Sequence, residues 1–128
     1  MNTRADAVGV TMENVVKKYG QTTALRDFGL VVESGEMVVL LGPSGCGKTT
    51  ALRCLAGLES VNGGRILVGD RDITHVPVQK REMAMVFQSY SLFPHLNALD
   101  NVAFGLRNKK VGKSAARTQA QEALELVG

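Results

Sequence analysis

A glycine-rich octapeptide carries the most informative chemistry in the sequence. Residues 42–49 read Gly-Pro-Ser-Gly-Cys-Gly-Lys-Thr, which fits the pattern G-x-x-x-x-G-K-[ST] at every position. Such glycines let backbone N–H groups close around a phosphate chain, while the lysine neutralises phosphate charge and the threonine hydroxyl holds Mg²⁺. We therefore predict a phosphate-binding loop in which Lys48 is the catalytic cation and Thr49 a metal ligand. The predicted binding residues are Gly42, Pro43, Ser44, Gly45, Cys46, Gly47, Lys48, Thr49 and Thr50.

The two cysteines are predicted to differ in reactivity. Cys46 lies inside the loop, beside Lys48 and a predicted helix N-terminus, both of which lower a thiol pKa, whereas Cys54 falls on the apolar side of that helix. Their spacing fits neither a zinc site nor a redox Cys-x-x-Cys, so free thiols in a reducing compartment are expected. His75 and His95 are isolated and offer no metal-binding pair.

A phosphate loop needs a strand before it and a helix after it. The apolar run Met37–Leu41 predicts a strand buried on both faces, as in a parallel sheet. Lys48–Ala56 has apolar residues at helical spacing, and Gly57 can close that helix. The start of the helix would then direct its positive dipole end at the phosphates.

Other segments show strand or helix periodicity. The further predicted strands cover Val8–Lys18, Ala24–Val32, Arg65–Val68 and Met83–Phe87, the last of them buried. Ser91–Leu106 reads as a loop followed by a helix. An amphipathic helix is predicted from Lys113 to Val127, with an apolar face formed by Ala116, Ala120, Ala123, Leu124 and Val127.

Composition restricts the class of protein. With 128 residues, 45% of them hydrophobic, the chain has the make-up of one soluble globular domain. The longest apolar run, Met37–Leu41, is too short to cross a bilayer, and Met1–Ala7 lacks the apolar core of a signal peptide. We therefore expect a cytosolic location. The net charge of +3 comes from scattered basic residues, which argues against nucleic acid as a partner.

Beyond the octapeptide, longer stretches closely resemble ABC transporter ATPases. Leu41–Thr50 and Leu55–Glu59 resemble their Walker A region, while Val86–Leu96 resembles their Q-loop and Asn101–Leu106 continues it. The resemblance covers nearly the whole chain from Val10 and is strongest to bacterial importers of polyamines, ferric iron or sugars. It implies an α/β fold: a P-loop NTPase (ABC ATPase) core, truncated, with an N-terminal antiparallel β subdomain.

The resemblance also assigns roles to residues outside the octapeptide. Tyr19 matches the aromatic position whose ring stacks on adenine. Gln88 matches the Q-loop glutamine, which reaches Mg²⁺ and the attacking water, and so counts as a catalytic residue and a metal ligand. Leu92, Phe93 and Leu96 have two open interpretations: a groove for the coupling helix of a transmembrane subunit, or ordinary core.

For cofactors and partners, the resemblance implies ATP, Mg²⁺, a second ATPase subunit in a homodimer, and transmembrane permease subunits. The protein would lie on the cytoplasmic face of the membrane, held there by the permease. In the family, the Leu-Ser-Gly-Gly-Gln signature, the Walker B aspartate with its catalytic glutamate, the D-loop and the switch histidine follow the Q-loop region. None occurs here, so residues 1–128 resemble the N-terminal portion of one ABC ATPase domain, which binds nucleotide without hydrolysing it alone.

Two alternative classes of function remain: another P-loop enzyme, either a GTPase or a small-molecule kinase, and a non-transport ATPase of the same superfamily. A GTPase should carry Asp-x-x-Gly after the loop and Asn-Lys-x-Asp later, yet Asp6–Gly9 lies upstream and Asn108–Val111 lacks the aspartate. A small-molecule kinase is a similar alternative among P-loop enzymes. A non-transport ATPase of the same superfamily is the other, although the segment Phe93–His95 favours transport.

The resemblance makes a final prediction about the sheet. In the family, later strands lie between the ones corresponding to Met37–Leu41 and Met83–Phe87. We expect the central sheet to be incomplete, re-paired within the chain, or completed by a second molecule, because unpaired strand edges cost free energy.

Overall fold

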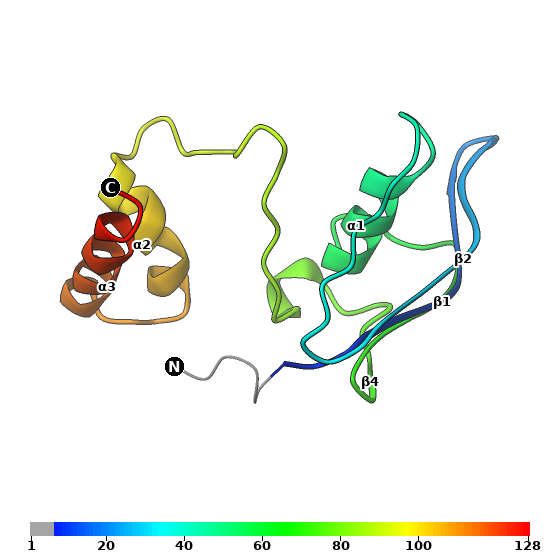
Figure 1. The fold of residues 1–128 in the computed structure, drawn as a ribbon, viewed down its shortest axis with the longest axis horizontal. Coiled ribbons are helices and arrows are strands. Elements are labelled where there is room, and N and C mark those ends of the chain that lie inside the picture. Colours follow the sequence, from blue (N-terminus) through cyan, green and yellow to red (C-terminus); the bar gives the residue numbers. More distant parts are fainter. Residues whose placement is uncertain (1–6) are drawn as a thin grey trace. The chain divides into compact units, whose positions relative to one another are not determined.

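The computed structural model describes residues 7–128. The segment Met1–Asp6, which belongs to the stretch without a signal-peptide core, lies outside the described residues. The chain divides into two compact units, Met1–Met85 and Val86–Gly128, and each is described by itself (Figure 1).

The first unit contains a four-stranded sheet. Its strands are β1 (Val10–Tyr19), β2 (Thr22–Val32), β3 (Gly63–Val68) and β4 (Arg71–Asp72), in the order β2-β1-β3-β4. All three neighbouring pairs are antiparallel, which confirms the N-terminal antiparallel subdomain. The two long strands form the hairpin drawn in blue in Figure 1. Strand β4 was not predicted, because two residues are too few for a periodic pattern.

An irregularity in β1 decides which of its side chains face the core. The register shifts between Met12 and Val15, and Asn14 between them has a left-handed backbone with φ 49. Met12, Val15 and Lys17 are consequently all buried. Strict alternation from Met12 would have placed Lys17 on the opposite face, because side chains of a regular strand alternate.

Helix α1 (Lys48–Ala56) is the predicted helix after the phosphate loop. It ends as predicted at Gly57, whose φ of 81 lets its N–H reach the carbonyls of Arg53 and Cys54. The helix buries its apolar side against the sheet, beside β2 in Figure 1. The shared core consists of Met12, Val15, Leu25, Ala51, Cys54, Ile66 and Ile73.

A buried arginine fastens the C-terminal end of α1. After the short helix η1 (Val78–Lys80), the Arg81 guanidinium donates to four backbone carbonyls. The acceptors are Cys54 O at 2.8 Å, Leu55 O at 2.6 Å, Val76 O at 2.8 Å and Thr74 O at 3.1 Å. Burial lowers the pKa of Arg81, yet a guanidinium stays protonated in proteins. Its charge therefore lies at the negative end of the α1 dipole.

The second unit contains the two predicted C-terminal helices, α2 (Ala98–Asn108) and α3 (Lys113–Glu125), which pack side by side (Figure 1). Their core is Ala103, Ala116 and Ala120, and Arg117 pairs with Asp100 at 3.3 Å. The predicted apolar face is correct for Ala116 and Ala120. It is wrong for Ala123 and Val127, which are exposed; α3 ends at Glu125, before Val127.

Two predicted strands are absent from the described residues. Neither Met37–Leu41 nor Met83–Phe87 is a strand, and the predicted parallel pairing is wrong, because no other described segment forms ladder hydrogen bonds with them. Burial on both faces is also wrong: Met37 is 90% exposed, Leu41 89% and Val86 82%. Of the three outcomes expected for the central sheet, residues 7–128 show the incomplete one. No helix in this range is long and apolar enough to span a membrane.

Candidate nucleotide-binding site

The backbone of the phosphate loop requires glycine at Gly47. This residue has φ 101, in the left-handed region, and a Cβ there would lie 2.8 Å from the Ala24 carbonyl oxygen and 3.0 Å from the Leu25 side chain. Gly45 has φ 80. Both conformations are strained for residues with a side chain. The loop backbone therefore comes within contact distance of β2 at the point where α1 begins.

The N-terminus of α1 is open to a ligand. Gly47 stands at the cap position and has no side chain to accept from the first N–H groups of the helix, and the first turn has no acidic residue. These N–H groups lack partners inside the helix and carry the positive end of its dipole. Such an end attracts a phosphate.

Lys48 places its ammonium at this loop. Its Nζ donates to the carbonyls of Gly42 at 2.6 Å and Pro43 at 2.7 Å, and to Cys46 Sγ at 3.3 Å. Thr49 is exposed and Thr50 half-buried in the first helical turn. The donor set of backbone N–H groups, one ammonium and threonine hydroxyls fits the oxygens of a phosphate chain and an associated Mg²⁺.

The two thiols differ as predicted. The hydrogen bond from Lys48 is the main reason that the pKa of the exposed Cys46 thiol is lowered. Burial raises the pKa of Cys54, which lies on the side of α1 that faces the core. We therefore expect Cys46 to be the more reactive nucleophile, since the thiolate is the attacking species.

Tyr19 stands at the end of β1, in the same unit as the loop. Its side chain is 45% exposed, so its ring is accessible. The Lys17 ammonium lies over the ring, 4.9 Å from its centroid. Lys17 therefore contacts one face of the ring.

Gln88 belongs to the second unit and is exposed. It is followed by two residues with left-handed backbones, Tyr90 at φ 61 and Ser91 at φ 51. Such conformations are uncommon outside glycine and cost free energy. Thr49 belongs to the first unit and Gln88 to the second. Coordination of one Mg²⁺ by both residues therefore stays a prediction.

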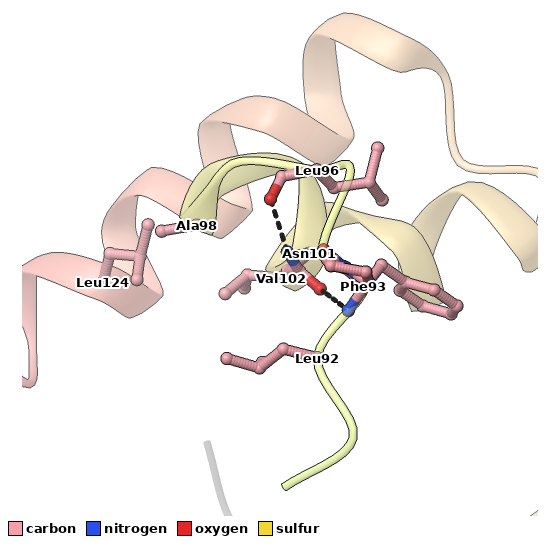
Figure 2. Close-up of a pocket in the computed structure, with 8 residues that line it drawn as sticks. Leu92, Phe93, Leu96, Ala98, Asn101, Val102 and Leu124 are labelled. Atoms are coloured by element: carbon pink, nitrogen blue, oxygen red, sulfur yellow. Dashed lines mark hydrogen bonds between the residues drawn. The ribbon is translucent and has the colours of Figure 1, made fainter.

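An apolar hollow of about 400 Å³ lies in the second unit (Figure 2). It contains all three residues with two open interpretations: Leu92, Phe93 and Leu96. Leu92 is 71% exposed and Phe93 37%, so these side chains line an open surface rather than a core. The other lining residues are Pro94, Ala98, Asn101, Val102 and Leu124, the last contributed by α3.

Asn101 holds the wall of this hollow in place. Its side chain accepts from Phe93 N at 2.8 Å and donates to three carbonyls: Phe93 at 3.2 Å, Leu96 at 3.1 Å and Asn97 at 3.0 Å. Two of these bonds are visible as dashed lines in Figure 2. The loop before α2 is thereby fixed to the helix itself.

Three structurally important polar residues were not identified from the sequence: Lys17, Arg81 and Asn101. A lysine on the buried side of a strand needs a partner for its charge, but the irregularity at Asn14 hides the side on which Lys17 lies. No local signal marks Arg81, whose acceptors lie up to 27 residues away. Within residues 7–128 no three His, Cys, Asp or Glu side chains gather closely enough to hold a metal ion.

Comparison with known proteins identifies one protein family. Residues 25–128 match the sequence profile of the family described as "ABC transporter". The chain is 58% identical, over 119 residues, to the Fe(3+) ions import ATP-binding protein FbpC of Brucella suis, covering 93% of this chain and 34% of the relative. It is 48% identical to the spermidine/putrescine import ATP-binding protein PotA of Aggregatibacter actinomycetemcomitans, covering 92% and 32%. The chain thus spans about a third of the length of these curated relatives.

Solved structures share the fold. The dimeric, post-hydrolysis ATP-binding cassette MJ0796 with ADP and Pi has a TM-score of 0.79 at 29% identity, covering 91% of this chain and 56% of the cassette. A bacterial Atm1-family ABC exporter with ATP bound has a TM-score of 0.69 at 32% identity, covering 78% and 18%.

Proposed function

Because this chain belongs to the ABC transporter family, we propose that it forms the nucleotide-binding part of an ATPase subunit that drives solute import. Membership confirms the resemblance inferred from the motifs. Together with the solved cassettes, it also confirms the predicted fold class, an α/β P-loop NTPase cassette with an antiparallel β subdomain. The named relatives favour this function over a P-loop kinase, a GTPase or a non-transport ATPase.

One observation carries the proposal: the phosphate loop joins an uncapped helix N-terminus to a lysine ammonium held at that loop. Both features are electrostatically suited to a triphosphate, because the helix dipole and the ammonium present positive charge to it. A loop that merely turned the chain would not need this lysine. The loop residues 42–50 would accordingly bind the phosphates of ATP, with Lys48 on the β- and γ-phosphates.

Mg²⁺ would accompany the triphosphate and neutralise charge on its oxygens. The Thr49 hydroxyl, exposed in the first turn of α1, is the proposed ligand from the loop, and Gln88 the proposed second ligand and the residue that orients water. Tyr19 would stack on the adenine base. Each of these roles rests on the family resemblance and on the exposure of the side chain concerned.

The proposed partners are a second ATPase subunit and a membrane permease. A homodimer is supported by the solved MJ0796 cassette, which is dimeric. The open apolar hollow at Leu92, Phe93 and Leu96 is the proposed contact for the permease, which would hold the protein at the cytoplasmic face of the membrane. Higher identity to the relatives named for Fe(3+) favours ferric iron over polyamines as the cargo.

We also propose that residues 1–128 are the N-terminal portion of one ABC ATPase domain. The shares of the relatives that the chain covers, about a third of FbpC and 56% of the MJ0796 cassette, support this. Hydrolysis would then need residues besides those described, since phosphoryl transfer requires a group that activates water as well as a phosphate cradle.

Nucleotide titration tests the proposal. Mg-ATP should bind the wild-type protein, and Lys48→Ala should weaken binding by more than about tenfold, because a hydrogen bond to a charged group contributes roughly 1.5–3 kcal/mol. The matched control is Lys80→Ala, which removes an exposed lysine of η1 and should leave affinity unchanged. Equal ATP affinities of wild type and Lys48→Ala would refute nucleotide binding by this loop.

A further inference from the structure

The buried lysine Lys17 contacts both the segment that follows α1 and Tyr19, the aromatic residue at the end of β1. The Lys17 side chain is 8% exposed, and its Nζ donates to the Ser60 carbonyl at 2.7 Å and pairs with Glu59 at 3.1 Å. The same ammonium lies 4.9 Å from the centroid of the Tyr19 ring. One cation therefore has three partners, two of them in the segment that follows α1.

Glu59 is well suited to fix that cation. It follows the C-terminal end of α1, and a second cation, Arg53, approaches it at 4.0 Å. The hydrogen bond from Lys17 is the main reason that the pKa of Glu59 is lowered, so the carboxylate stays ionised at neutral pH. A buried ammonium with an ionised partner and a carbonyl acceptor has little freedom to move.

These contacts connect the two ends of a nucleotide site. The phosphate loop opens α1, Glu59 follows the end of α1, Lys17 binds Glu59, and Tyr19 lies against Lys17. A change in any of these contacts would alter where the ring stands relative to the loop. The distance between an adenine base and its phosphates is limited by the nucleotide, so this placement matters for binding.

We propose that Lys17, held by Glu59, is a positioning residue for Tyr19: its ammonium covers one face of the ring, and the opposite face receives the adenine base. The inference rests on the proposed function, in which Tyr19 stacks on adenine. A cation over one face attracts the ring electrostatically and holds it in a single orientation. A ring that is already oriented loses less conformational freedom when the base binds.

The proposal separates binding of the base from binding of the phosphates. Lys17→Met keeps the length and apolar stem of the side chain but removes the ammonium. It should weaken ATP binding roughly three- to tenfold, the effect expected for a cation over an aromatic ring. It should leave binding of inorganic tripolyphosphate unchanged, because that ligand has no base. Lys17→Arg keeps the cation and should restore most of the ATP affinity.

The experiment measures affinities for Mg-ATP and Mg-tripolyphosphate by calorimetry on the whole protein. The variants are Lys17→Met, Lys17→Arg, Glu59→Gln and Tyr19→Ala, and the control is Lys18→Met, which alters the neighbouring exposed lysine. Glu59→Gln should shift the ratio of the two affinities in the same direction as Lys17→Met, by a smaller factor. It also provides a second route if Lys17→Met does not fold.

The outcomes distinguish this inference from the proposed function. If Tyr19→Ala lowers the ratio of ATP to tripolyphosphate affinity while Lys17→Met and Glu59→Gln leave it at the wild-type value, positioning by Lys17 is refuted and stacking stands. An equal loss of both ligands in Lys17→Met would mean that Lys17 acts only on the stability of the fold, and would also refute it. If Tyr19→Ala itself leaves the ratio unchanged, the adenine-stacking role in the proposed function fails.

Discussion

At the scale of single residues, Lys48 organises the phosphate loop through short contacts. Its ammonium lies between two carbonyls at the start of the loop and the Cys46 sulfur in its middle. A cation so placed stabilises a thiolate and attracts phosphate oxygens for the same electrostatic reason. Thiol chemistry can therefore report on the state of the loop.

Cys46 should react with iodoacetamide faster than Cys54, which is buried. Because the pKa of Cys46 is lowered and that of Cys54 raised, the rate for Cys46 should reach its plateau at a lower pH. Lys48→Ala should move the Cys46 profile to higher pH, since the main cause of the lowered pKa is lost. Mass spectrometry of labelled peptides across a pH series measures this, with Lys80→Ala as the control.

Bound Mg-ATP should protect Cys46, because phosphates would occupy the loop that exposes its sulfur. Labelling of Cys54 should be slow with or without nucleotide. Equal labelling of the two cysteines, or labelling of Cys46 that nucleotide does not affect, would contradict the placement of phosphates in this loop.

At the scale of elements, Arg81 attaches α1 to the segment that follows the sheet. Its guanidinium satisfies carbonyls from the last turn of α1 and from residues 74–76 at once. No acidic side chain pairs with it among the described residues, so backbone dipoles alone compensate its buried charge. The helix that carries the phosphate loop thus depends on a residue far along the chain.

Arg81→Met should lower the free energy of unfolding by about 2–3 kcal/mol, because it leaves buried carbonyls without donors. Arg81→Lys should cause a smaller loss, since an ammonium keeps the charge but cannot span four acceptors in a planar fork. Urea unfolding measures both, with the exposed Arg71→Met as the matched control. An Arg81→Met protein as stable as wild type would contradict this role.

Asn101 plays a similar part in the second unit, where its amide adds to the backbone bond from Leu96 N to Phe93 O at 3.1 Å in the loop before α2. Asn101→Ala should increase amide hydrogen exchange at Phe93 and Leu96, because both lose a contact that fixes the loop. The exposed Asn108→Ala, at the end of the same helix, should leave this exchange unchanged. Wild-type protection of Phe93 in Asn101→Ala would show that the loop is held by packing alone.

At the scale of the whole molecule, apolar side chains are exposed where sheet strands were expected. Met37, Val39, Leu41 and Val86 are all at least 69% exposed. Their backbone groups make no strand ladder with other described segments. Exposed apolar chain with unpaired backbone groups favours association with another chain.

A polypeptide of these 128 residues, prepared alone, should therefore self-associate and bind a hydrophobic dye such as ANS. The double variant Val39→Glu/Leu41→Glu should reduce both effects, because charge opposes association of apolar segments. Sedimentation velocity and dye fluorescence measure the two properties. A monomer that unfolds cooperatively and binds no dye would contradict the incomplete sheet.

The same polypeptide should show no ATP turnover above background, since phosphoryl transfer needs a water-activating group.

The sequence by itself determined the local features of the protein. The octapeptide at 42–49, the helix after it with its end at Gly57, the long strands β1 and β2, and helices α2 and α3 all follow from periodicity and turn chemistry within short windows. The family followed from the same motifs. Each of these signals depends on residues a few positions apart, which is why the sequence alone was enough.

Only the tertiary structure decided the rest. Whether Met37–Leu41 is a strand depends on hydrogen-bonding partners elsewhere, because a strand, unlike a helix, cannot satisfy its own backbone groups. The side on which Lys17 lies depends on the irregularity at Asn14. The partners of Arg81 are 27 residues away at Cys54, and no periodicity along the chain encodes a contact of that separation.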